Sequence, residues 1–218
     1  MFDLNLLELP TLKRIDGEVR YYETPRGNLY PSVTSVLGAM TDKSGLEKWK
    51  KRVGEKEAER IKKRGGVRGT AVHLILEDYV LNRSVDVKKQ MPITVSLYNQ
   101  IKSSLEHNVN NIRCSEGMLF SDRLKVAGSV DLVADYNGIP SIIDFKTSGS
   151  EKRKEWITSY FLQATLYSMM LYEMTGVACP QIVILIAVED SNHPQIFVDK
   201  VENWINDARL ICKQYHSK

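Results

Sequence analysis

The chain has 218 residues, of which 43% are hydrophobic and 26% are charged, and its net charge is +3. This composition is ordinary for a globular domain and excludes a disordered or collagen-like chain. The length suits one compact domain around a single core. Three widely separated cysteines, Cys114, Cys179 and Cys212, form no CxxC pair, which disfavours a disulfide framework and a cysteine-rich metal centre.

The first half of the chain is predicted to be mostly helical. Its first forty residues indicate irregular chain plus a hairpin around the turn at 25–28, where the sequence is Pro-Arg-Gly-Asn. A helix is expected from Ser44 to about Lys63 and should end at Gly65–Gly66. Thr70 can then cap a second helix with an apolar stripe. A third helix is expected from about Ile93 to His107.

The second half changes character and is rich in short β-type runs. Strands are expected at 112–120, 126–136 and 140–148, separated by turn signals. A long amphipathic helix at 154–175, strands at 181–188 and 195–200, and a C-terminal helix should follow. No run is as long as the roughly 20 apolar residues that cross a bilayer. The order of elements predicts an α/β fold with a central mixed β-sheet flanked by helices.

Basic residues are concentrated between Lys43 and Arg68, where eleven Lys or Arg residues stand against four Glu. The rest of the chain is mildly acidic, so the stretch would suit a polyanion passing along one side of the molecule. A solvated helix with Glu–Lys neighbours is the commoner explanation of such a run and stays open.

The strongest chemical signal lies in two of the expected strands. Side chains alternate along a strand, so Asp144 and Lys146 share one face, and apolar neighbours on both faces indicate that this strand is buried. Asp131 lies in a similar setting. Buried charges are costly unless they are paired or bind a metal, so either a structural ion pair or a cation site is indicated. For Asp-x-Lys alone, the structural pair is favoured.

Glu116 adds a third acidic residue on a third strand. The even positions from Ile112 to Phe120 are predicted to share one face, where Glu116 would interrupt an apolar stripe. A solvated Glu on an edge strand explains that pattern equally well. Three acids beside a lysine nevertheless match what phosphodiester hydrolysis needs, namely a hard divalent cation next to an ammonium group.

Two further pairs lie four residues apart on expected helices: His73 with Glu77, and Gln163 with Tyr167. A lone histidine is more often a core or surface group than a ligand, and ordinary amphipathicity explains the second pair. Neither pair indicates a function without its context.

Taken together and in order, five segments resemble the RecB-type branch of the PD-(D/E)XK nuclease superfamily. They are GTAVH ending at His73, SEGML with Glu116, GSVD ending at Asp131, IIDFK ending at Lys146, and QATLY from Gln163 to Tyr167. The match spans about residues 65–190, and GSVD stands where the superfamily name has PD. Within the branch the chain is most similar to mitochondrial genome maintenance exonucleases and related phage exonucleases.

The resemblance implies a restriction-endonuclease-like core and a role for each matched residue. Asp131, Asp144 and the backbone carbonyl of Phe145 would hold one or two Mg²⁺ or Mn²⁺ ions, with His73 and Glu116 at or beside the metal. Lys146 would act on the nucleophile. Gln163 and Tyr167 would steady the lysine strand and the DNA backbone. Cysteines that hold an iron–sulfur cluster in some relatives have no counterpart, so no such cluster is expected.

The resemblance also implies a helical arch that guides single-stranded DNA, at residues 1–68, before a nuclease core at 69–218. Its expected DNA-binding residues are Trp49, Lys50, Lys51, Arg52, Lys62, Lys63, Arg64 and Arg68. The expected activity is a DNA exonuclease that prefers single strands. A double-strand-specific exonuclease, an endonuclease and a non-catalytic nucleic-acid-binding factor remain alternatives. We expect a soluble protein in a reducing compartment, a bacterial or phage-infected cytoplasm rather than a mitochondrial matrix, with no membrane partner.

Overall fold

The structure, a computed structural model, describes residues 1–42 and 44–218, and Lys43 of the basic stretch lies outside the described residues. Its centre is a five-stranded sheet in the order β4-β5-β6-β7-β8, in which only β6 and β7 are parallel neighbours. The strands are β4 (Val109–Ser121), β5 (Val126–Tyr136), β6 (Ile139–Ser148), β7 (Gln181–Val188) and β8 (Gln195–Lys200). The predicted mixed sheet is therefore confirmed.

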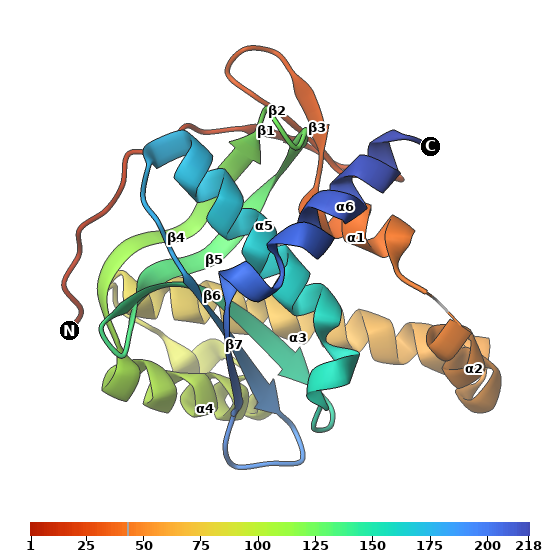
Figure 1. Cartoon of the computed structure of the whole chain (residues 1–218). Helices are drawn as coiled ribbons and strands as arrows, with labels where there is room; N and C mark the ends of the chain where they lie inside the picture. The colour runs from red at the N-terminus through yellow and green to blue at the C-terminus, as the bar shows by residue number, and fades with distance from the viewer. Residues whose placement is uncertain (43) are drawn as a thin grey trace.

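Helices cover both faces of this sheet (Figure 1). One face carries α1 (Val33–Met40), α5 (Thr158–Thr175) and α6 (Ile205–His216). The other face carries α3 (Glu55–Val80) and α4 (Pro92–Asn108), while α2 (Ser44–Val53) lies away from the sheet beside the start of α3. Short 3₁₀ turns occupy Val87–Lys89, Lys154–Trp156 and Val201–Asn203. This three-layer arrangement confirms the predicted α/β class with helices flanking the sheet.

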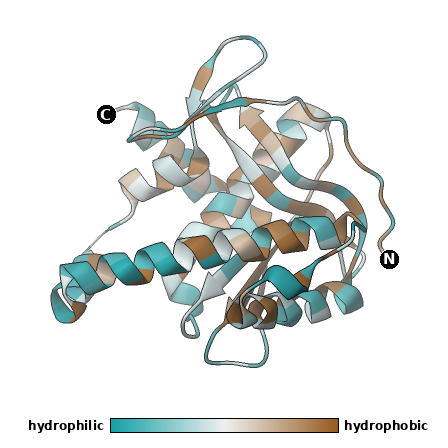
Figure 2. Cartoon of the chain, turned by 180° about the vertical axis from the view of Figure 1, so that it is seen from behind, coloured by the Kyte–Doolittle hydropathy of each residue, from teal (hydrophilic) through white to brown (hydrophobic). Residues whose placement is uncertain are grey.

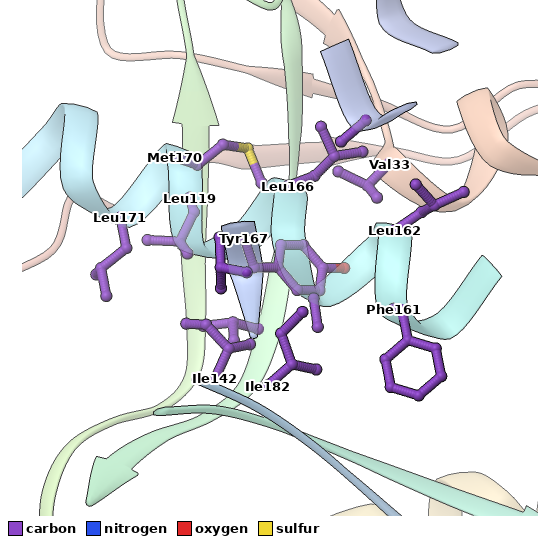
Figure 3. Close-up of a cluster of buried hydrophobic side chains, with 14 of the residues drawn as sticks. Val33, Leu119, Ile142, Phe161, Leu162, Leu166, Tyr167, Met170, Leu171 and Ile182 are labelled. Atoms are coloured by element: carbon purple, nitrogen blue, oxygen red, sulfur yellow. The ribbon is translucent and has the colours of Figure 1, made fainter. Parts of the chain in front are cut away.

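Two apolar cores lie between these layers. Phe161, Leu166 and Met170 of α5 pack on Ile142 and Ile182 of the sheet (Figure 3). The opposite core joins buried residues of α3 and α4 to the other face of the strands. Strand β7 is apolar toward both cores, which explains why its sequence is a continuous aliphatic run rather than an alternating one.

Local signals in the sequence explain where several elements begin and end. Ser32 caps α1 by accepting a hydrogen bond from the Ser35 amide at 3.0 Å. Gly176 ends α5 in the left-handed conformation. Asn137 and Gly138 both have positive φ, as a two-residue turn between β5 and β6 requires.

The amino-terminal residues add a second, smaller sheet and protect an edge of the large one. Strands β1 (Lys13–Ile15), β2 (Tyr21–Glu23) and β3 (Leu29–Pro31) form an antiparallel sheet, which includes the predicted hairpin. The preceding chain runs along β4, where the amides of Asn5 and Leu7 donate to carbonyls of that strand at 2.8 Å. This segment covers part of the β4 edge, which would otherwise present unpaired backbone groups.

Three predictions about the first eighty residues are wrong. Thr70 does not cap a second helix, because it lies inside α3 (Glu55–Val80). The helix predicted from Ser44 to Lys63 breaks at Gly54, whose φ is +88°, and α3 then continues without interruption through Gly65 and Gly66. The polar first half of α3 projects beyond the body of the molecule together with α2 (Figure 2). The first forty residues also contain α1, which the sequence analysis did not predict.

The predicted single face of residues 112–120 is also wrong. Ile112 packs in the core beneath α3 and α4, whereas Cys114 packs in the core beneath α5. A register shift between Asn110 and Cys114, together with positive φ at Asn111 and Glu116, breaks the alternation.

The remaining helix predictions hold with small shifts. Helix α4 matches the predicted third helix, and the helix predicted from 154 begins as α5 at Thr158, after a 3₁₀ turn. The proposed boundary between residues 68 and 69 falls inside α3. Among the described residues, none of the helices combines the length and apolarity needed to cross a membrane.

Candidate active site

The acidic residues lie where strands β5 and β6 separate, a position that we call the fork. Pairing between β5 and β6 ends at Leu132 and Ile143, although β6 continues beside β7 as far as Ser148. Just beyond the last pair, the Asp131 carboxylate takes the place of the strand partner and accepts a hydrogen bond from the Phe145 amide at 2.7 Å. A polar side chain therefore enters the sheet where its two halves separate.

Three candidate ligands from three elements meet at this fork. Ligand atoms of His73, Glu116 and Asp131 lie within 4.8 Å of one another. His73 Nδ1 is 3.5 Å from Asp131 Oδ1 and 3.6 Å from Glu116 Oε1. On its other side, His73 Nε2 lies 2.9 Å from the Phe145 carbonyl oxygen, so that nitrogen donates and Nδ1 faces the carboxylates.

The backbone of β4 turns Glu116 toward the cluster. Its φ of +50° is in the left-handed region, which side-chain-bearing residues rarely adopt. Ser129 on β5 donates to Glu116 Oε2 at 3.0 Å and leaves Oε1 toward His73. Such a strained conformation is often found where function constrains the backbone.

Asp144 and Lys146 form a second part of the site. Asp144 is 1% exposed, and its Oδ2 contacts Lys146 Nζ. Neither Asp144 oxygen has a hydrogen-bond partner of regular geometry among the described residues. The Lys146 ammonium also lies 5.0 Å from the centre of the Tyr160 ring, a cation–π distance.

The charges in this site act on one another. Burial alone would lower the pKa of His73, but Asp131 and Glu116 outweigh it and raise that pKa to about 9. Burial raises the pKa of Asp131 to about 6, assisted by Asp144 and opposed by His73. Burial would lower the pKa of Lys146, but Asp144 and Asp131 raise it. In the metal-free site these carboxylates therefore favour the ammonium form of Lys146.

This donor set is chemically suited to a divalent cation. Two carboxylates and an imidazole converge on one point, and excess negative charge there is what a metal would neutralise. Asp144 Oδ2 already contacts the Lys146 ammonium, whereas the buried Oδ1 has no hydrogen-bond partner among the described residues and could accept a further contact. Asp144 is not part of the three-residue cluster and faces Lys146 instead.

Gln163 and Tyr167 lie on α5 behind the fork. Gln163 Nε2 donates to the Tyr167 hydroxyl at 3.2 Å. Tyr167 is only 3% exposed, and its ring lies so close to Gly128 of β5 that a Cβ there would be 2.9 Å from Cε1. The Tyr167 ring is therefore buried against β5.

The basic stretch is displayed along α2 and the first half of α3. Seven of its expected DNA-binding side chains are half-buried or exposed there: Trp49, Lys50, Lys51, Arg52, Lys62, Lys63 and Arg64. Arg68 differs, because its side chain is 11% exposed and pairs with Glu189 at the end of β7. Glu77 likewise pairs with Arg83 at 3.4 Å rather than joining His73 in the cluster.

Three features of this site are not predicted from the sequence: the Tyr160 contact with Lys146, the Ser129 contact with Glu116 and the Arg68–Glu189 pair. Tyr160, whose ring lies beside the Lys146 ammonium, is not among the residues that the sequence predicts for the site. Ser129 gave no signal, because a strand serine is ordinary on its own. The Arg68–Glu189 pair joins residues far apart in sequence, which no local pattern reports.

Comparison with known proteins identifies a relative of the chain by sequence. The chain is 29% identical over 205 residues to mitochondrial genome maintenance exonuclease 1 of Homo sapiens, across 88% of this chain and 56% of the human protein. The chain is a relative of exonucleases. The relationship expected from the motifs is thereby confirmed. The chain nevertheless spans little more than half the length of that human relative.

Among solved structures, the chain is similar to a crystal structure from Eubacterium rectale described as a candidate exonuclease. The TM-score is 0.44 with 14% identity, covering 67% of this chain and 64% of the other. No family model matches the chain.

Proposed function

We propose that the protein is a metal-dependent deoxyribonuclease that degrades DNA from its ends and prefers single strands. The observation that carries the proposal is the meeting of His73, Glu116 and Asp131 beside the buried Asp144–Lys146 pair. The similarity to an exonuclease supports the same reaction class.

His73, Glu116 and Asp131 would hold a divalent cation, with Asp144 and the Phe145 carbonyl at its border. Such a cation supplies Lewis acidity to phosphate oxygens and lowers the pKa of a bound water, whether one or two ions are present. Imidazole alongside carboxylates is compatible with Mn²⁺ as well as Mg²⁺. The finer proposal is an in-line attack of water of the two-metal type.

Lys146 would stabilise charge rather than abstract a proton. Asp144 and Asp131 keep it as an ammonium, and Asp144 with the Tyr160 ring fixes its position. A fixed positive group costs little reorganisation when negative charge develops on the phosphate. Tyr167 and Gln163 would hold α5 against β5 so that this arrangement persists.

The projecting basic helices would guide the strand. Their exposed lysines and arginines can contact phosphates, and Trp49 offers a face on which an unpaired base can stack. We call α2 and the first half of α3 the basic arm. Its concentration of positive charge, apart from the acidic cluster, favours a strand that passes along the arm toward the acidic cluster.

Digestion of linear and circular single strands tests the proposal. With Mg²⁺ or Mn²⁺, linear strands should disappear while circles of the same sequence persist, and EDTA should stop the loss of the linear strands. Rapid loss of circles would indicate an endonuclease, and faster loss of linear duplex would indicate a double-strand exonuclease. No loss of any substrate would favour a non-catalytic binding factor.

A further inference from the structure

A cavity beside the candidate active site has no part in the proposed chemistry so far. It has a volume of about 350 Å³ and lies between α1, the start of α2 and the first turns of α5. Its lining includes Thr34, Gly38, Leu46, Ser159, Tyr160 and Gln163. Tyr160 is the shared wall, because its ring also lies 5.0 Å from Lys146 Nζ.

The chemistry of the lining favours a neutral group with hydrogen-bonding edges. None of the described lining residues is basic, and Asp42 already accepts hydrogen bonds from the Ser44 amide and hydroxyl at 2.8 and 2.7 Å. Ser159 and the Gln163 amide oxygen offer polar contacts, while Leu46 offers an apolar one. Among the described lining residues a phosphate would find no positive partner, whereas a base and sugar would find polar and apolar contacts.

The Lys146 ammonium lies beside the Tyr160 ring and supplies the positive charge that the described lining residues lack. A nucleotide matches this arrangement, because its neutral base and sugar would suit the cavity and its anionic phosphate would suit the ammonium. We infer that the cavity holds one nucleoside unit of the DNA strand, the unit adjoining the bond to be cut, while its phosphate faces Lys146. This inference rests on the proposed nuclease function and adds a binding subsite to it.

The size of the cavity bears on substrate selection. Its volume is at the low end of the range of about 300–1,000 Å³ typical of small-molecule sites. A space of this size accepts one unpaired nucleoside, whereas a base pair would have to be opened first. The subsite thus gives a physical reason for a preference for single strands that is independent of the basic arm.

Gly38→Leu tests the inference by filling the cavity. A Cβ at Gly38 would meet nothing within 4 Å, so the larger side chain enters open space. Leucine also has a higher helix propensity than glycine, so α1 should not be destabilised. Gly38→Ala is the matched control, because it removes the glycine but leaves most of the volume free.

Binding is measured by calorimetry in EDTA, with oligothymidylates of four and thirty nucleotides. Gly38→Leu should bind the four-nucleotide strand at least about tenfold more weakly than wild type, which corresponds to about 1.4 kcal/mol. Gly38→Ala should stay within about twofold. The thirty-nucleotide strand, which also reaches the basic arm, should lose much less affinity. Thermal unfolding of each variant verifies that it is folded.

Equal affinity of wild type and folded Gly38→Leu for the four-nucleotide strand would overturn the inference. The measurement is independent of hydrolysis, because EDTA withholds the metal. If wild type fails to cut DNA with metal but Gly38→Leu still loses binding, the nuclease proposal fails and the nucleoside subsite stands. If wild type cuts DNA and binding is unchanged, the nuclease proposal stands and the subsite fails.

Discussion

The two carboxylate oxygens of Asp131 contact different parts of the site. One carboxylate oxygen accepts the Phe145 amide hydrogen and so holds the fork between β5 and β6. The other oxygen faces His73 in the candidate metal cluster. The geometry of the fork and the position of the proposed cation are therefore set by the same side chain.

Asp131→Asn should separate the effects of these two contacts. The amide oxygen of Asn can still accept from the Phe145 amide, so the fold should persist, but the lost negative charge should weaken Mn²⁺ binding by about 10- to 100-fold. Titration calorimetry with Mn²⁺ measures this. Glu77→Gln, one turn from His73 on α3 but paired with Arg83, is the control and should change the affinity little. Unchanged Mn²⁺ affinity in Asp131→Asn would remove Asp131 from the cation site.

Tyr160 is expected to act through Lys146. Tyr160→Phe keeps the ring face and should retain near-wild-type kcat, whereas Tyr160→Leu should lower kcat about tenfold because a partly desolvated cation–π contact contributes about 1–2 kcal/mol. Steady-state kinetics on linear single strands makes the comparison. Equal kcat values for the Phe and Leu variants would argue against this positioning role.

For single residues, the sequence predicts which side chains share a strand face better than it predicts irregular backbone conformations. Alternation along a buried strand is enough to put Asp144 and Lys146 on one face, and their contact agrees with it. The same rule misplaces Glu116, because it assumes a regular strand and Glu116 has a positive φ. Backbone irregularities of this kind depend on packing between distant residues, such as Leu9 against Gly117, which local patterns do not contain.

At the scale of elements, α3 shows how tertiary packing overrides a local signal. Gly65–Gly66 predicts a helix end, yet α3 continues, and the break between helices falls at Gly54 instead. A helical glycine costs about 0.5–1 kcal/mol, which the packing of the second half of α3 on the sheet can outweigh. The two glycines precede Val72, where the part of α3 that packs in the core begins.

Gly65→Ala and Gly66→Ala should each stabilise the protein by about 0.5–1 kcal/mol. A Cβ at either position meets nothing within 4 Å, so no steric cost opposes the gain in helix propensity. Denaturant unfolding measures the change. Gly128→Ala is the matched comparison and should destabilise, because its Cβ would lie 2.9 Å from the Tyr167 ring. Destabilisation by both α3 substitutions would mean that the helix is not continuous there.

The Arg68–Glu189 pair fastens α3 to the end of β7. Breaking a largely buried ion pair leaves one charge uncompensated, so Arg68→Ala should lower the free energy of unfolding by about 3 kcal/mol. Arg83→Ala, whose side chain is 55% exposed, should cost less than about 1 kcal/mol. The comparison is again made by denaturant unfolding. Equal losses of unfolding free energy in the two variants would show that the Arg68–Glu189 pair stabilises the protein no more than an exposed pair does.

At the scale of the whole molecule, the order of elements was enough to predict the fold class. Strands separated by short turns must pair locally, and a helix between β6 and β7 permits a parallel crossover, so a mixed sheet follows. The sequence does not show that residues 3–7 line the β4 edge or that α1 packs beside α5. Both depend on long-range contacts of short segments with weak local patterns.

The assembly also explains why the site lies where it does. The sheet separates at Asp131 and Asp144, α3 brings His73 from one face, and α5 brings Tyr160 from the other. The basic helices project on the side of α2, and the cavity lies between α1, the start of α2 and the first turns of α5. A strand end guided by the arm would therefore meet the cavity and the acidic cluster together.

The most direct test of this account compares wild type with Lys146→Ala on an end-labelled linear single strand in Mn²⁺, with binding to the same strand measured in EDTA. The account predicts that wild type degrades the strand, and that Lys146→Ala loses cleavage by about a thousandfold or more while binding stays within a few-fold. Equal cleavage by the two proteins would contradict it, because the ammonium beside the acidic cluster would then have no part in the reaction.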